Sequence, residues 1–152
     1  MPAPHRPVRS SAHVTVSAPA ERVWDLLADP KGWSTWFLPV VGADLGGDRP
    51  LTEGVRFRWR LGVGTVVSEV VAADGRQLVW RSRYLGLRTE HAWTVRPVPE
   101  GTHVTSTKTV GGIPARLGRP LVQRWVDRTL QEWVDSLSTT APHLAEPEGA
   151  PA

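Results

Sequence analysis

The stretch Val14-Thr-Val-Ser-Ala-Pro-Ala-Glu-Arg-Val-Trp-Asp-Leu-Leu-Ala-Asp-Pro-Lys-Gly-Trp33-Ser-Thr-Trp36 passes from a strand pattern into helix patterns. Residues 13–17 alternate between polar and apolar side chains, which predicts a strand. A helix should follow, because Pro19 suits a first helical turn and Pro30 ends the apolar period after it. Residues 31–36 predict a second, short helix. The chain is thus expected to begin with one strand and two short helices.

Strand patterns dominate the middle of the chain, and the predicted strands span residues 40–45, 55–61, 65–71, 77–85, 87–98 and 102–110. Residues 55–61 alternate apolar side chains with three arginines, which indicates an antiparallel strand with one wet face. Asp74-Gly75 is a strong hairpin signal. These strands, with the first one, predict an antiparallel sheet of about seven strands.

The period becomes helical between residues 114 and 140, where apolar side chains recur at spacings of three and four. Pro120 either kinks this helix or marks its true beginning. We therefore expect an α+β architecture, in which a curved sheet surrounds a long C-terminal helix. One helix cannot cover a strongly curved sheet completely, so a cavity is expected between them.

Composition limits the classes of protein that this chain can represent. The 152 residues suit one domain, predicted at 11–140 with disordered tails at 1–10 and 141–152. The net charge of +3 is scattered, which argues against nucleic-acid binding. The absence of Cys excludes disulfides and thiolate sites. No apolar stretch approaches the roughly 20 residues of a membrane span, and residues 1–10 lack the apolar region of a signal peptide. A cytoplasmic protein is expected.

The chain contains eight Trp residues but only two Phe and one Tyr. Tryptophan is large and carries an N–H group that usually needs a hydrogen-bond partner. The eight residues are spread from the first predicted helix to the C-terminal helix, which indicates wide aromatic walls around an interior. The alternative is that they simply fill an apolar core.

Three stretches carry a resemblance to a known superfamily. They are the opening stretch quoted above, the segment Trp93-Thr-Val-Arg-Pro-Val-Pro-Glu-Gly-Thr102-His-Val-Thr, and the C-terminal helix. Together they span about residues 11–140 and resemble the helix-grip fold of the START/Bet v 1-like (SRPBCC) superfamily, more closely its bacterial polyketide cyclase/dehydrase branch. The resemblance implies a deep apolar cavity for lipids, sterols, polyketides or other flat hydrophobic molecules. Some members are aromatase/cyclases that fold a polyketide and assist aldol closure and dehydration.

The chain departs from the aromatase/cyclases at one position. In those enzymes an Arg from the fourth strand is associated with catalysis, but the corresponding stretch, Leu61-Gly-Val-Gly-Thr-Val-Val-Ser68, contains no Arg. Arg56, Arg58 and Arg60 lie opposite the apolar face of their strand and are expected in solvent. This departure weighs against the enzyme interpretation.

Four polar side chains are expected to face the cavity: Ser68, Ser82, Tyr84 and His91. His91 is a candidate acid/base or ligand donor, because histidine titrates near neutral pH; alternatively it is a hydrogen-bonded core or surface histidine. Tyr84 is a second candidate donor or acid/base. The other predicted ligand-binding residues form the walls: Trp33, Trp36, Phe57, Trp59, Trp80, Trp93, Leu121, Trp125 and Thr129. Lys108 and Glu90 are expected to pair on the wet face of the sheet.

The loop from Trp33 to Leu38 allows two interpretations. Its aromatic side chains either form an exposed rim over the cavity mouth, suited to a carrier or enzyme partner, or they close the end of the domain as ordinary core. The five histidines are scattered without metal-ligand spacing, so we expect no metal and no cofactor.

The expected function is binding of a medium-sized hydrophobic ligand, aromatic or polycyclic and lipid- or polyketide-like, in the internal cavity. The alternative is a polyketide cyclase/aromatase-type enzyme that promotes aldol cyclisation and dehydration in the same cavity. A third hypothesis is a protein-interaction module that uses the Trp33 to Leu38 rim.

Overall fold

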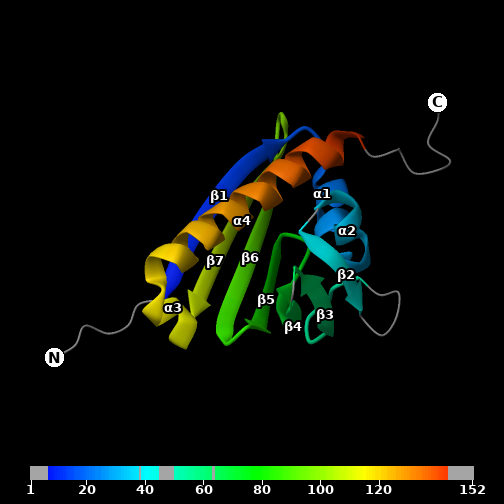
Figure 1. The fold of residues 1–152 in the computed structure, drawn as a ribbon. Coiled ribbons are helices and arrows are strands. Elements are labelled where there is room, and N and C mark those ends of the chain that lie inside the picture. The colour runs from blue at the N-terminus through cyan, green and yellow to red at the C-terminus, as the bar shows by residue number, and fades with distance from the viewer. Residues whose placement is uncertain (1–6, 38, 45–49, 63, 144–152) are drawn as a thin grey trace.

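A computed structural model describes residues 7–37, 39–44, 50–62 and 64–143 and shows one antiparallel sheet with helices on one side (Figure 1). In this part of the chain the strands are β1 (Val8–Val16), β2 (Val40–Asp44), β3 (Arg56–Leu61), β4 (Gly64–Ala73), β5 (Gln77–Tyr84), β6 (Leu87–Val98) and β7 (Gly101–Gly111). Their order across the sheet is β1-β7-β6-β5-β4-β3-β2, so only β1 pairs with a strand distant in the sequence. The predicted fold class is confirmed.

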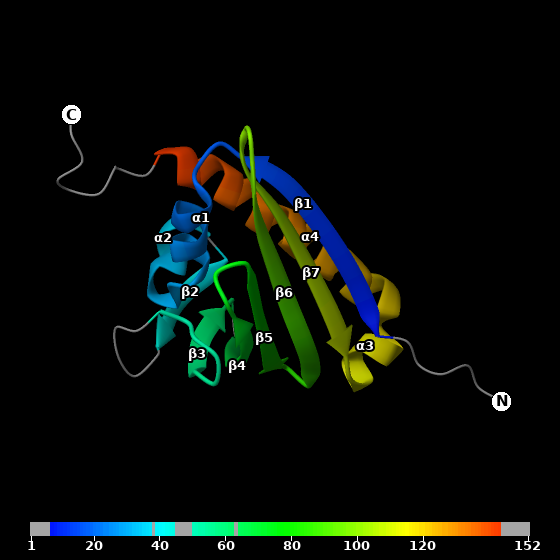
Figure 2. The same ribbon diagram turned by 180° about the vertical axis from the view of Figure 1, so that it is seen from behind.

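The helices are α1 (Ala20–Leu27), the 3-10 turn η1 (Pro30–Gly32), α2 (Trp33–Trp36), α3 (Ile113–Leu117), α4 (Arg119–Thr140) and the 3-10 turn η2 (Ala141–His143). Figures 1 and 2 show α4 lying across one face of the sheet, over β1 and β7, with α1 and α2 beside its C-terminal end. We call the sheet face that α4 covers the inner face. Within the described ranges, no helix combines the length and the apolarity needed to cross a membrane.

The helix predicted at residues 114–140 is divided at Gly118, which separates α3 from α4. Pro120 lies in the first turn of α4, where a helix has no internal partner for its N–H groups and proline costs little. Of the two alternatives, Pro120 therefore marks the beginning of the long helix and does not kink it.

Some residues assigned to the two predicted tails lie within strands or helices of the structure. Strand β1 begins at Val8, which is fully buried and pairs with Val110 of β7. Residues 8–10, predicted as part of a disordered tail, therefore belong to the sheet. At the other end, Ala141 is also fully buried in η2. A single apolar side chain next to a polar segment is too weak a pattern to reveal such pairing from the sequence. Residues 1–6 and 144–152 lie outside the described residues.

The strand alternation predicted which side chains face inward. In β3, Phe57, Trp59 and Leu61 are buried, whereas the arginines between them are exposed. Ser68, Ser82 and His91 are also buried, as the same alternation in β4, β5 and β6 requires. Because a shift of one residue would reverse every assignment, this agreement confirms the phase of all four strands.

Candidate functional site

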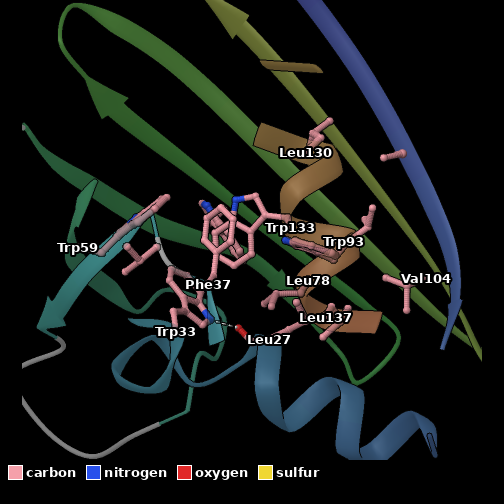
Figure 3. Close-up of a cluster of buried hydrophobic side chains, with 14 of the residues drawn as sticks. Leu27, Trp33, Phe37, Trp59, Leu78, Trp93, Val104, Leu130, Trp133 and Leu137 are labelled. Atoms are coloured by element: carbon pink, nitrogen blue, oxygen red, sulfur yellow. Dashed lines mark hydrogen bonds between the residues drawn. The ribbon is translucent and has the colours of Figure 1, made fainter. Parts of the chain in front are cut away.

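Eight aromatic side chains fill the interior between the sheet and the C-terminal half of α4. This aromatic cluster comprises Trp33, Trp36, Phe37, Phe57, Trp59, Trp80, Trp93 and Trp133, and all eight are buried. Trp133 of α4 lies near its centre, stacked on Phe37 with ring centroids 3.9 Å apart and edge-on to Trp93 at 5.8 Å (Figure 3). Trp133 was not among the predicted site residues, although its helical spacing from Leu130 and Leu137 places it on the apolar side of α4.

The loop from Trp33 to Leu38 does not form the exposed rim that the sequence allowed. Trp33 and Phe37 are fully buried and Trp36 is only 8% exposed. The Trp33 indole N–H donates a hydrogen bond to the Leu27 carbonyl at 3.1 Å, drawn as a dashed line in Figure 3. The core alternative is therefore correct for residues 33–37, because the turn at Pro30 directs α2 against α4. The aromatic side chains of this segment therefore form no exposed rim; Leu38 lies outside the described residues.

A buried polar chain connects β3, β4 and β5 on the inner face. The Trp59 indole N–H donates to Ser68 Oγ at 2.9 Å, and Ser68 Oγ lies 2.6 Å from Ser82 Oγ. The two serines are directly opposite each other in the β4–β5 register. The chain brings together three predicted site residues and satisfies their hydrogen bonds within the protein.

His91 lies on β6 between two aromatic rings. Its ring centroid is 4.9 Å from those of Trp80 and Trp93, and its Nε2 is 2.6 Å from Ser106 Oγ of β7. Burial lowers the pKa of His91 well below its usual value, and the Lys108 charge lowers it further. The imidazole is therefore neutral at pH 7, unlike the expected group that titrates near neutrality. Its hydrogen bond to Ser106 agrees with the core-histidine alternative.

Four buried nitrogen atoms in this region have no hydrogen-bond partner among the described residues. They are the indole nitrogens of Trp36, Trp93 and Trp133 and the Nδ1 atom of His91. The Trp133 ring lies within 6.0 Å of the Trp36, Trp93 and His91 rings, so the four atoms belong to one part of the interior. Because an unpaired buried polar group costs about 1–3 kcal/mol, such a concentration in one place requires an explanation.

Lys108 corrects the sequence prediction most strongly. It was expected on the wet face with Glu90, but it is 4% exposed on the inner face, directly opposite His91 in the β6–β7 register. Glu90 instead pairs with Arg81 across β5 and β6, at 3.7 Å. The sequence did hold the signal, because Lys108 shares its strand parity with Val104 and Val110. Burial lowers the pKa of Lys108 from 10.5 to about 8, so the ammonium group is mainly charged at pH 7.

The N-terminal half of α4 places one aromatic ring over this lysine. The Lys108 ammonium nitrogen lies 5.0 Å from the centroid of Trp125, a distance at which a cation is attracted to the ring face. Trp125 also stacks on Tyr84, with ring centroids 6.2 Å apart. Tyr84 donates its hydroxyl to the Leu61 carbonyl at 2.8 Å, and burial raises its pKa. This hydrogen bond makes Tyr84 a poor proton donor to a ligand.

Two predicted residues on α4 do not offer ligand contacts. Leu121 is 71% exposed, so its assignment to the cavity wall is wrong. The break at Gly118 sets the phase of α4, and Leu121 in its first turn then points away from the sheet. Thr129 is buried, but its hydroxyl donates to the Trp125 carbonyl at 2.7 Å within the helix.

Among the surface hollows that the described residues form, two have no lining residue from α4, and Ser68 and Ser82 are among the residues that line the larger of these two. The larger, of about 900 Å3, is lined by exposed charged side chains that include two ion pairs, Arg56–Glu69 and Arg81–Glu90. The smaller, of about 480 Å3, lies at the β5–β6 turn and includes Tyr84. The aromatic cluster lies between the sheet and the C-terminal half of α4, where the sequence predicted a cavity.

The seven-stranded sheet closed by α4, with polar groups buried on its inner face, defines a START-like helix-grip protein. The chain belongs to the family described as polyketide cyclase / dehydrase and lipid transport, whose family profile matches residues 7–142. A comparison with curated proteins gave no match.

Solved structures share this fold at low sequence identity. The ZhuI aromatase/cyclase from Streptomyces sp. R1128 has a TM-score of 0.77 and 19% identity, with 93% of this chain and 97% of that chain covered. A START superfamily protein from Mycobacterium smegmatis has a TM-score of 0.75 and 18% identity, covering 90% and 99%. The di-domain ARO/CYC StfQ from the steffimycin biosynthetic pathway has a TM-score of 0.76 and 15% identity, covering 90% and 51%. At these identities the likeness shows the fold alone.

Proposed function

We propose that the protein binds a medium-sized hydrophobic ligand, aromatic or polycyclic, between the inner face of the sheet and α4. The observation that supports this most directly is the group of buried nitrogen atoms without partners on Trp36, Trp93, Trp133 and His91. A core built only for stability pairs such groups or replaces them with apolar ones. A ligand with oxygen acceptors would pair them, while the surrounding rings bury its apolar surface at about 25 cal/mol per Å².

The test is a binding screen of aromatic polyketides, sterols and fatty acids by intrinsic tryptophan fluorescence, with native mass spectrometry of co-purified compounds. Trp93→Phe and Trp133→Phe remove an unpaired N–H together with the pyrrole part of the indole ring, so we expect about 5- to 30-fold weaker binding, corresponding to about 1–2 kcal/mol. Trp24→Phe is the matched control, because Trp24 of α1 makes no ring contact with the cluster and is only partly buried. No saturable response and no co-purified compound would mean that the aromatic cluster is an ordinary core.

A second candidate, a cyclase of the aldol type, is favoured by the cross-strand pair His91 and Lys108. A neutral imidazole can accept a proton, and a nearby ammonium group can stabilise the enolate that results. If this candidate is correct, His91→Gln should abolish turnover of a bound polyketide while saturable binding of the polyketide persists. Equal turnover by the natural protein and His91→Gln would exclude His91 as the base.

A further inference from the structure

Lys108 is a buried cation whose interior neighbours supply no negative charge. In the strand register the residues beside it are His91 on β6 and Ser10 on β1, and α4 contributes Trp125. Within the described ranges, the carboxylates of Glu69 and Glu90 form ion pairs with arginines elsewhere, and none forms an ion pair with Lys108. Buried charges in proteins are normally paired, because desolvation of a lone charge is costly.

The identity of this cation is unusual for the chain. Only two of the 18 basic residues are lysines, Lys31 and Lys108, and the other 16 are arginines. Lys31 is exposed, so Lys108 is the lysine that the fold places inside. An ammonium group is a compact point charge that can meet one oxyanion from several directions, whereas arginine favours a planar two-point contact.

The other polar groups nearby are hydrogen-bond donors without acceptors. The Trp93 and Trp133 indoles can only donate, and both nitrogen atoms are unpaired and buried. His91 Nδ1, also unpaired, is a donor when its Nε2 accepts the hydrogen bond from Ser106. Among the described residues, this part of the interior therefore combines one positive charge with nitrogen donors that have no partner, and no carboxylate forms an ion pair with Lys108.

Taking the proposed ligand binding as its basis, we propose that the ligand is an aromatic oxyanion, a carboxylate, phenolate or enolate on a ring system, whose charge pairs with Lys108. The ring walls favour an aromatic body: Trp80 and Trp93 flank His91, and Trp125 covers the lysine. The oxyanion of the ligand would form an ion pair with the Lys108 ammonium group. Its remaining oxygen atoms would accept from the unpaired N–H groups.

The test compares acids with neutral isosteres of the same shape. Isothermal titration calorimetry at pH 7 measures 2-naphthoate against 2-naphthamide, and anthracene-2-carboxylate against its primary amide, on the full chain. We expect at least tenfold tighter binding of each acid by the natural protein. In Lys108→Met the acid should lose this preference, while the amide binds within threefold of its original affinity. Lys31→Met is the matched control and should retain the full preference.

The outcomes separate this inference from the proposed function. Equal affinity for acid and amide in the natural protein would overturn the inference and leave the proposed function intact. No binding of either member of either pair would contradict the proposed function as well. If Lys108→Met does not fold, Lys108→Gln provides the same neutral comparison; an acid preference that survives in either variant would overturn the assignment to Lys108.

Discussion

Replacement of Lys108 by Met should stabilise the protein at neutral pH, and the gain should disappear in alkaline solution. Burial lowers the pKa of this lysine from 10.5 to about 8. The difference corresponds to about 3 kcal/mol, because each pKa unit is worth about 1.4 kcal/mol. Methionine has a similar length and carries no charge that must be desolvated. We therefore expect Lys108→Met to raise the free energy of unfolding at pH 7 by up to about 3 kcal/mol.

The pH dependence isolates the charge from the packing. Between pH 8 and 10.5 the unfolded chain holds the lysine proton more tightly than the folded protein, so the natural protein gains stability as the pH rises. Below pH 8 both states are protonated and the full cost of burial remains. The stability difference between Lys108→Met and the natural protein should therefore be largest below pH 8 and fall as the pH approaches 10.5.

Urea unfolding followed by tryptophan fluorescence at pH 7, 9 and 10.5 measures this difference. Tyr84 also titrates in alkaline solution, but it is present in both proteins and cancels in the comparison. Lys31→Met, at an exposed position, is the control for loss of a lysine charge, and its stability difference at pH 7 should be smaller than that of Lys108→Met. A difference for Lys108→Met that is constant from pH 7 to 10.5, or a variant less stable than the natural protein at pH 7, would refute the buried cation.

Three further predictions concern stability. Below pH 6.5 the natural protein should lose stability, because the unfolded chain takes up a proton on His91 that the buried imidazole does not. His91→Gln should make this loss smaller in urea unfolding at pH 7, 6 and 5. An equal loss of unfolding free energy in the variant and the natural protein would show that this is wrong. Trp133→Ala should cost about 3–5 kcal/mol in urea unfolding, and a loss no larger than that of Trp24→Ala would place Trp133 outside the core. Gly101→Ala should lower the melting temperature far more than Gly75→Ala. Both glycines have positive φ, but only at Gly101, of these two, would the added Cβ collide with a backbone carbonyl, that of Val16. Equal losses of melting temperature would contradict this.

The sequence prediction agrees best with the structure where the alternation of apolar and polar residues along a strand decides which side chains are buried. Alternation in β3–β6 depends only on which face is buried, so Ser68, Ser82 and His91 could be placed inside from the sequence. The order of elements, set by Pro19, Pro30 and Asp74-Gly75, was sufficient for the fold class. Local backbone constraints act over a few residues and are therefore readable in the linear chain.

The polar content of the interior depended on pairing between distant strands. Lys108 and Glu90 were expected to pair on the wet face of the sheet. The β6–β7 register instead places His91, and not Glu90, opposite Lys108. The phase of α4 similarly depends on the break at Gly118, which sends Leu121 outward. Register and helix phase are set by the packing of the whole sheet, so local sequence does not determine them.

By itself, then, the sequence determined a curved antiparallel sheet with a long C-terminal helix and an interior rich in tryptophan. Only the tertiary structure decided that these tryptophans pack against one another and that Trp36 and Phe37 are buried. It also placed beside His91 an ammonium group that forms no ion pair with the described residues. The physical reason is that the periodicity of apolar residues along a strand or helix indicates which of its side chains are buried. Contacts among the buried side chains arise only when segments from both ends of the chain meet.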